Sequence, residues 1–489
     1  MKKTPGPGAA TEDSGVVIPA DAEGRRSSSR LGREVTAAAL DPVDPVGAAA
    51  ALREVDWRNG YPVHARRLVE AGLGRTRDEL AIAEAGLTAV RDRLRITTDS
   101  GEAPLAEALE RPAARPLHTR TVHGTQAPAE EFSLPHAGRR LTGDKLLERL
   151  AAWERSGILE PSAADAVREV AAHPEWLALR GRRVVVLGAS AEMGPLRALL
   201  SWGAEVVAVD LPRPELWQRL EKLARSSAGV LMLPEQQDGP GADLLQDLPA
   251  VADWLGGLDG PLVLGNYVYA DGAVNLRLSA ATDLLATRLT GARDDVALAW
   301  LATPTDVFAV PPEVVEASAE AYDHRGLRAF RPLIKGVSGG RLLKRNHRPG
   351  TSPGIADAMI PQQGPNYILA KRLHRWRAAV ARRDGVEVSL RVAPPTKTRS
   401  VTRNRALAAA YAGAHHFGIE VFDPATSNTL MAALLVHDLN TGGSALPATA
   451  APWQHEAEKA VHGGLWRGAY DPRSALGLAL VLGWGAVRG

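Results

Sequence analysis

The stretch Arg182–Leu211, RRVVVLGASAEMGPLRALLSWGAEVVAVDL, decides the fold that this chain is expected to adopt. Four apolar residues, Val184 to Leu187, precede Gly188, and such a run bounded by glycine is typical of a strand buried on both faces. Leucines at helical spacing then predict a short helix that Gly203 ends, and a second apolar strand closes on Asp210. The stretch therefore predicts a strand–turn–helix–strand unit.

The same alternation of apolar strands and amphipathic helices continues along the chain. Further strands are expected at 229–233, 261–266, 296–301 and 386–392, and helices at 215–223, 244–255, 273–289, 366–383 and 427–438. Strands that alternate with helices in this way are typical of an α/β protein with a doubly wound parallel sheet of the Rossmann type. We expect this domain to span residues 181–445, with an aperiodic insertion at 308–362.

The regions on either side of this domain are expected to be organised differently. Residues 1–47 are rich in Ala, Gly, Pro, Ser and Arg without a period, which predicts a disordered tail. Residues 48–180 are expected to form a mainly helical N-terminal region, with a Pro- and His-bearing linker near 111–138 and a last helix that Ser162 caps. Residues 446–489 are expected to be a C-terminal tail that packs on the core.

The composition excludes several classes of protein. The chain has 489 residues, of which 45% are hydrophobic and 23% charged, and its net charge of +2 does not indicate a nucleic-acid partner. It contains no cysteine, which excludes thiol catalysis, and its histidines lack metal-ligand spacing, so no metal is expected. The Arg-rich helices are expected to present solvated faces. Without an apolar signal region or a membrane-spanning segment, a cytoplasmic protein without membrane contact is expected.

The glycine turn and the acid after it together predict a nucleotide site. Glycine permits the tight turn, the N–H groups at the start of the following helix attract a pyrophosphate, and Asp210 is placed to accept hydrogen bonds from a ribose diol. The same unit without a ligand is the alternative. The residues expected to bind are Gly188, Ser190, Met193, Gly194 and Asp210.

A second constellation lies near the start of the helix expected at 366–383. Tyr367 and Lys371 are four residues apart, so their side chains share one face of that helix. An ammonium group beside a phenol favours the phenolate. Lys371 is therefore expected to lower the pKa of Tyr367 toward a value useful for proton transfer.

Taken together, these motifs resemble the short-chain dehydrogenase/reductase (SDR) family. The similarity covers roughly residues 182–439, and the chain would be a divergent member with a helical N-terminal extension and an insertion before Tyr-x-x-x-Lys. The matching positions, in chain order, are the turn Gly188–Gly194, Asp210, Asn266, Asn275, Tyr367 with Lys371, and Pro394 to Thr398 after the sixth strand.

The resemblance implies an NAD(P)-dependent oxidoreductase that transfers a hydride between a nicotinamide and a carbonyl or alcohol carbon. Tyr367 would act as general acid/base, Lys371 would lower its pKa and hold the ribose, and Asn275 would belong to the catalytic group. The resemblance also implies further cofactor contacts from Asn266, Lys371, Pro394 and Thr398.

The chain departs from the family's pattern at three places. Glu192 stands where the family has its middle glycine, and a carboxylate there repels a phosphate unless it points away. The serine that closes the fifth strand in the family is absent; this strand ends near Thr303 and Thr305, and we expect Thr305 to supply the hydroxyl, with a serine of the insertion as the alternative. Pro395 replaces the turn glycine after the sixth strand and stiffens that loop.

The resemblance further implies which cofactor and partners to expect. Asp210 favours NAD, because the 2′-phosphate of NADP would meet a like charge. Arg213, three residues later, offers a positive charge for that phosphate, so NADP stays an alternative. We expect a small-molecule substrate. The basic insertion segment 341–348 would either cover the site and favour an acidic substrate or form a solvated loop. The helix of Tyr367 is the family's usual dimer contact, which leaves a homo-oligomer open.

Two other functions stay open at this point. An S-adenosylmethionine-dependent methyltransferase shares the strand, glycine turn, helix and terminal acid, but it leaves Tyr367, Lys371 and Asn275 unexplained. A non-catalytic Rossmann scaffold or sensor would account for Glu192 and for the missing serine. Binding of NAD(H), of S-adenosylmethionine or of neither distinguishes the three.

Overall fold

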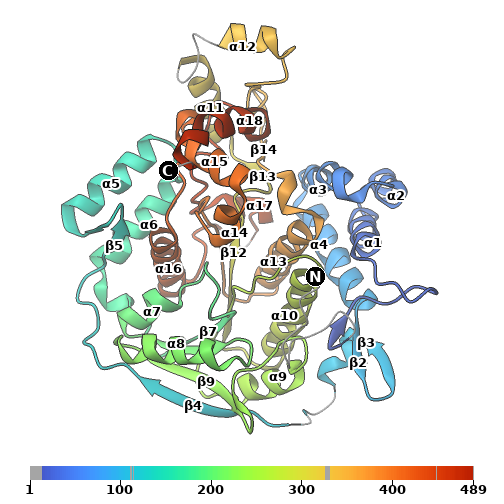
Figure 1. The fold of residues 1–489 in the computed structure, drawn as a ribbon, viewed down its shortest axis with the longest axis vertical. Helices are drawn as coiled ribbons and strands as arrows, with labels where there is room; N and C mark the ends of the chain where they lie inside the picture. Colours follow the sequence, from blue (N-terminus) through green and yellow to red (C-terminus); the bar gives the residue numbers. More distant parts are fainter. Residues whose placement is uncertain (1–13, 111–112, 114, 325–330, 448, 488–489) are drawn as a thin grey trace.

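The computed structural model describes residues 14–487 apart from 111–112, 114, 325–330 and 448. Among these residues, eight strands form a central sheet, and six of them run parallel in the order β9-β8-β7-β11-β12-β15 (Figure 1). The expected mixed α/β fold with a mostly parallel sheet is confirmed. The parallel strands are β7 Arg183–Leu187, β8 Glu205–Val209, β9 Val230–Gln236, β11 Leu262–Asn266, β12 Val296–Ala302 and β15 Val388–Val392.

Helices cover both faces of this sheet, because its strands are apolar on both sides. Val184 and Val186 of β7 belong to one hydrophobic cluster, whereas Val185 and Leu187 belong to the other. Side chains of alternate residues on one strand thus reach opposite layers of helices. The first layer contains α7 Leu196–Trp202, α8 Pro214–Arg225 and α16 Pro424–Thr441, and the second contains α9 Leu248–Gly256, α10 Ala273–Ala292 and α13 Pro365–Arg383.

The N-terminal segment is folded from residue 14, so the disorder expected for residues 1–47 is wrong over 14–47; residues 1–13 lie outside the described part. Helix α1 Ser28–Leu40 begins after Ser27, whose side chain accepts a hydrogen bond from Arg30 N at 3.2 Å. One face of α1 is buried against α4 Thr76–Arg93. The helix cap and this packing stabilise a folded segment, which the Ala-rich composition alone does not predict.

The region 48–180 is helical in large part, but it also adds strands. The expected linker near 111–138 contains β4 His118–His123, which pairs antiparallel with β9 and extends the central sheet. Ser162 does not cap the last helix; Glu160 holds that position, and Ser162 Oγ accepts from Lys459 N at 3.0 Å instead. Other elements are β1 Val16–Val17, α2 Pro45–Arg53, α3 Trp57–Gly72, β2 Arg95–Thr98, β3 Gly101–Pro104, β5 Leu134–His136, β6 Arg139–Leu141, α5 Gly143–Arg155 and α6 Pro161–Ala172.

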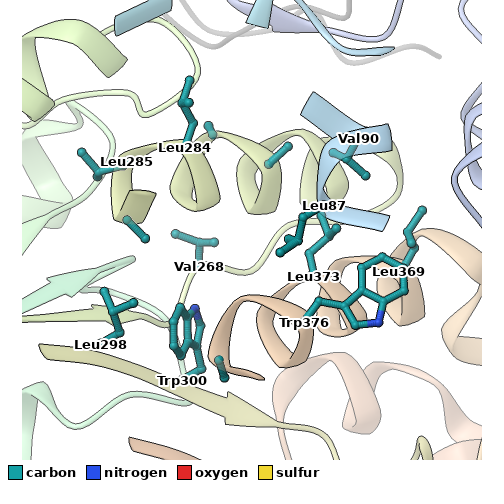
Figure 2. Packing of buried hydrophobic residues seen from close by; sticks show 14 of the residues in the cluster. Leu87, Val90, Val268, Leu284, Leu285, Leu298, Trp300, Leu369, Leu373 and Trp376 are labelled. Atoms are coloured by element: carbon teal, nitrogen blue, oxygen red, sulfur yellow. The ribbon is translucent and has the colours of Figure 1, made fainter. Parts of the chain in front are cut away.

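Helix α4 packs across α10 and α13 and buries one face of α13 (Figure 2). Leu87 and Val90 of α4 meet Leu373 and Trp376 of α13 there. The approach is close: a Cβ added at Gly86 would lie 2.3 Å from the Trp376 ring. The N-terminal region therefore occupies this face within one chain.

The insertion 308–362 is not aperiodic in its described part. β13 Val307–Val310 and β14 Gly354–Asp357 pair antiparallel, and a helix follows β13. The C-terminal tail packs on the core as expected, and Trp466 is fully buried in it. The remaining helices are α11 Pro312–His324, α12 Arg331–Val337, α14 Arg399–Arg403, α15 Arg405–Gly413, α17 Pro452–Ala457 and α18 Pro472–Gly483.

Candidate functional site

A cavity of about 490 Å³ opens at the carboxyl ends of β11, β12 and β15. Its walls are the segments that follow these three strands, the start of α13, part of α14 and α15, and one residue each of the glycine turn and α3. Loops at the carboxyl ends of parallel strands converge on one edge of a sheet, which is where open α/β sheets bind ligands. The volume is that of a small-molecule site.

The hydroxyl of Tyr367 ends a chain of hydrogen bonds inside this cavity. Its partner is the Thr303 side chain, and Thr303 Oγ1 lies 2.9 Å from Thr305 Oγ1. Gln363 Nε2 donates to Thr305 Oγ1 at 2.5 Å, while Gln363 Oε1 accepts from Ile360 N at 3.3 Å, which fixes the orientation of the amide. Between the two threonines, either hydroxyl can be the donor, so this chain holds Thr303 and Thr305 beside the phenol of Tyr367.

Burial raises the pKa of Tyr367 to about 12, and the hydrogen bond from Thr303 opposes that rise only in part. The expectation that Lys371 lowers this pKa below its ordinary value is therefore wrong. The ammonium Nζ lies 5.9 Å from the centroid of the Tyr367 ring and donates to the carbonyl of Leu301 at 3.1 Å. At neutral pH the phenol is protonated, and its hydroxyl has a proton available to donate.

Lys371 is also affected by its surroundings. Burial lowers its pKa to about 8, because the ammonium group loses water contact beside the end of β12. The group is still mostly charged at neutral pH. It supplies positive charge close to the phenol that would lose a proton.

The structure brings together most of the expected catalytic residues. Tyr367, Lys371, Thr305 and Asn275 all line the cavity. Asn275 is buried, and its Oδ1 accepts from Ala270 N at 3.1 Å, so it holds the loop after β11 in place. Ser338 and Ser352 of the insertion, the alternative source of a hydroxyl, do not line the cavity. Thr303 rather than Thr305 is the threonine that contacts Tyr367.

The expected cofactor-binding residues divide into two groups. Met193, Lys371, Pro394 and Thr398 line the cavity, whereas Gly188, Ser190, Gly194, Asp210 and Asn266 do not. Asn266 is buried, donates to Thr282 Oγ1 at 2.6 Å and accepts from Val268 N at 3.2 Å, so it stabilises the end of β11.

The carboxylate of Asp210 holds the glycine turn. Its Oδ2 accepts from Ser190 N at 2.7 Å and its Oδ1 accepts from Leu211 N at 2.8 Å. Gly188 has φ +78°, and a Cβ there would lie 2.9 Å from Val268 Cα. The glycine is therefore required by the packing of the turn against the chain after β11.

Glu192 bridges the glycine turn and the start of α14. Its Oε2 accepts from Arg399 N at 2.7 Å, and its backbone carbonyl accepts from Asn428 Nδ2 at 2.7 Å. The neighbouring residues on both sides of this bridge, Met193 and Thr398, line the cavity. The carboxylate thus lies at the rim between the turn and the loop after β15.

The basic insertion segment does not cover the cavity, so the expectation of a lid is wrong. Its members Arg341, Lys344, Arg345 and Arg348 are not among the lining residues. Arg345 instead donates to Asp323 at 2.6 Å and lies over the Tyr322 ring, 4.1 Å from its centroid.

Behind the cavity, α13 carries buried ion pairs rather than the solvated face expected for an Arg-rich helix. Asp306, which directly follows Thr305, accepts from Arg372 at 2.8 Å and from Arg375 at 2.8 Å. Arg375 also binds both carboxylate oxygens of Glu456, at 2.7 and 2.5 Å. This network fixes the end of β12 against the helix that carries Tyr367.

Glu79 of α4 lies next to this network and makes the stability pH-dependent. Its Oε2 is buried without a hydrogen-bond partner, and burial together with the charge of Glu456 raises its pKa from 4.5 to about 8. The folded state thus holds a proton that the unfolded state releases above pH 4.5. The free energy of unfolding should fall as the pH rises from 4.5 through 8, by about 1.4 kcal/mol per pKa unit.

Glu79→Gln, which stays neutral, should remove this fall in the free energy of unfolding with rising pH. Urea denaturation at pH 5, 7 and 9 measures it, with the exposed Glu84→Gln of the same helix as control. Equal slopes of stability against pH in wild type and Glu79→Gln would contradict the assignment.

Several residues of the cavity wall were not predicted from the sequence. Arg58 comes from the N-terminal region, Gln363 precedes α13, Tyr269 follows β11 and Tyr411 belongs to α15. The rings of Tyr269 and Tyr367 contact edge to face, 6.2 Å between centroids. Of these residues, only Gln363 has a local sequence signal. The Gln-Gln-Gly run before Pro365 predicts polar side chains directly before the start of a helix.

No protein-family model matches the chain, and no curated protein matches it. In the part of the chain that the structure describes, no group of three metal-ligating side chains is present, and no helix is long and apolar enough to cross a membrane. Any statement on function therefore depends on the cavity and its residues.

Proposed function

We propose that this chain is an NAD(P)-dependent oxidoreductase that reduces a carbonyl group held in the cavity, with Tyr367 as proton donor. The observation that carries this proposal is the convergence of Tyr367, Lys371, Thr303 and Asn275, from three elements, on one cavity. A methyltransferase does not require this set of four residues. A scaffold does not require a buried phenol and a buried ammonium group in one cavity.

The strand order supports a Rossmann-type sheet. Numbered by chain order, the parallel strands are arranged 3-2-1-4-5-6, which is the order of dinucleotide-binding sheets. In such sheets the ligand lies where the strand order reverses, next to the first and fourth strands. Here these are β7 and β11, and the cavity extends from the end of β11 to β12 and β15, with Met193 as the one lining residue of the turn after β7.

A bound nicotinamide would supply the hydride. The chain's own contribution is proton transfer: Tyr367 donates its phenolic proton to the oxygen on which negative charge develops. Thr303 holds the phenol in orientation through its hydrogen bond, and Thr305 Oγ1, 2.9 Å from Thr303 Oγ1, supports Thr303. The Lys371 ammonium stabilises the phenolate that is left behind.

The residues fit the cofactor on one side of the cavity better than on the other. Lys371, Pro394 and Thr398 would hold the nicotinamide and its ribose. On the other side, the pyrophosphate must pass between the glycine turn and α14, where the Glu192 carboxylate already accepts the Arg399 N–H. That negative charge should weaken dinucleotide binding.

Glu192→Gln should therefore bind NADH or NADPH roughly tenfold more tightly than wild type, a difference of about 1.4 kcal/mol. A thermal-shift titration with NADH, NADPH and S-adenosylmethionine measures this on both proteins. Glu215→Gln, which removes an exposed carboxylate of α8, is the control and should behave as wild type.

The same titration tests the proposed function. A rise in melting temperature with NADH or NADPH supports an oxidoreductase. A rise with S-adenosylmethionine alone would favour the methyltransferase, and no rise with any ligand, in wild type or Glu192→Gln, would leave the scaffold as the better explanation.

A further inference from the structure

We propose that Arg58 binds a carboxylate of the substrate, so that the cavity takes small oxo acids in preference to neutral carbonyl compounds. This inference rests on the proposed function. It also assigns a role to the N-terminal helical region, which supplies this side chain to a cavity otherwise built by the sheet domain.

The fold holds Arg58 at the cavity from a distant part of the sequence. Arg58 is the second residue of α3, and Asp56 caps that helix by accepting from Asn59 N at 3.4 Å. Its neighbours Trp57 and Tyr61 are 5% and 3% exposed and belong to a hydrophobic cluster with Val307 and Ile368. The start of α3 is thus anchored to β13 and α13, while Arg58 itself stays exposed.

The guanidinium lies against the residue that precedes the helix of Tyr367. A Cβ added at Gly364 would be 2.2 Å from Arg58 Nη1, so the guanidinium lies directly on the Gly364 backbone. Gly364 has φ +81° and immediately precedes α13, three residues before Tyr367. A side chain at position 364 would displace Arg58, and glycine leaves room for it.

The charges around the cavity favour an anion at this point. Among the described lining residues, the charged side chains are Arg58, Lys371 and Asp271, and Asp271 accepts from the Tyr269 hydroxyl at 3.3 Å. No carboxylate lies within ion-pair distance of Arg58 in the described chain. The start of α13 beside it adds the positive end of a helix dipole.

The chemistry of the side chain selects the class of anion. A guanidinium binds a carboxylate through two parallel hydrogen bonds, a geometry that a neutral ketone or an ester cannot match. Arg58 and Tyr367 line the same cavity, so an oxo acid would place its carboxylate on Arg58 and its keto oxygen on Tyr367.

Pairs of 2-oxo acids and their methyl esters test the inference, because the two members differ only in the charge. NADH-dependent reduction of each should favour the acid in wild type. In Arg58→Gln, kcat/KM for the acid should fall 10- to 100-fold, while that for the ester stays within about twofold. Arg53→Gln, an exposed arginine outside the cavity, is the matched control.

A binding measurement separates this inference from the proposed function. In thermal-shift titrations without cofactor, the 2-oxo acids should stabilise wild type and Arg53→Gln but not Arg58→Gln, and the esters should not distinguish the three. If acid binding depends on Arg58 but no acid is reduced, the anion site is supported and the proposed oxidoreductase activity is contradicted. Equal responses of wild type and Arg58→Gln to the acids, in rate or in binding, would overturn the inference.

Discussion

Tyr367→Phe is expected to lower kcat for carbonyl reduction by at least about a hundredfold while leaving NADH binding unchanged. The substitution removes one oxygen, and a positioned general acid contributes about 10²- to 10⁴-fold. Phenylalanine keeps the ring contact with Tyr269, so the wall of the cavity keeps its shape. Initial rates of NADH oxidation with the oxo acid panel measure the effect, and the melting temperature in NADH checks the binding.

Tyr411→Phe is the matched control for this prediction. Tyr411 lines the same cavity from α15, and burial raises its pKa as well, but Tyr367 is the phenol that ends the threonine chain. The control should keep its rate within a few-fold of wild type. A Tyr367→Phe enzyme that still turns over at the wild-type rate would mean that the proton comes from another group.

The parallel sheet could be predicted from local sequence because its strands are buried on both faces. Such strands appear as uninterrupted apolar runs bounded by turn residues, and all six begin within two residues of the expected position. The edge strand β4 lacks this pattern. Its sequence His118-Thr-Arg-Thr-Val-His123 is mostly polar, and it is held by backbone pairing with β9.

The cavity could be predicted in part for a geometric reason. Residues that end parallel strands meet at one edge of the sheet, so Thr305 and Pro394 are expected to lie near each other. Arg58 could not be found in this way, since its place depends on how α3 packs. The direction of the Tyr367 pKa shift also depends on packing, because burial outweighs the hydrogen bond from Thr303.

Asp438→Asn is expected to cost about 3–5 kcal/mol of unfolding free energy, the largest stability effect that we predict. Asp438 and Arg391 are each 1% exposed, and the two carboxylate oxygens accept from Arg391 at 2.7 and 2.7 Å. Lys459 Nζ donates to Asp438 Oδ1 at 2.9 Å. Removing this charge leaves the buried guanidinium and ammonium with the Glu458 carboxylate alone, 3.7 Å from Arg391 and 3.8 Å from Lys459.

The pH dependence of this effect distinguishes lost charge from lost packing. Burial opposes ionisation, but Arg391 and its neighbours hold the pKa of Asp438 well below its ordinary 3.8. Its stabilisation is therefore present above pH 3.8 and is lost as the pH falls through the lower folded value. Urea denaturation should show a large gap between wild type and Asp438→Asn at pH 7 that narrows toward pH 2. Asp423→Asn, whose partner Lys397 is 3.5 Å away on the surface, should cost less than about 1 kcal/mol. A gap that stays constant with pH would assign the loss to packing instead of charge.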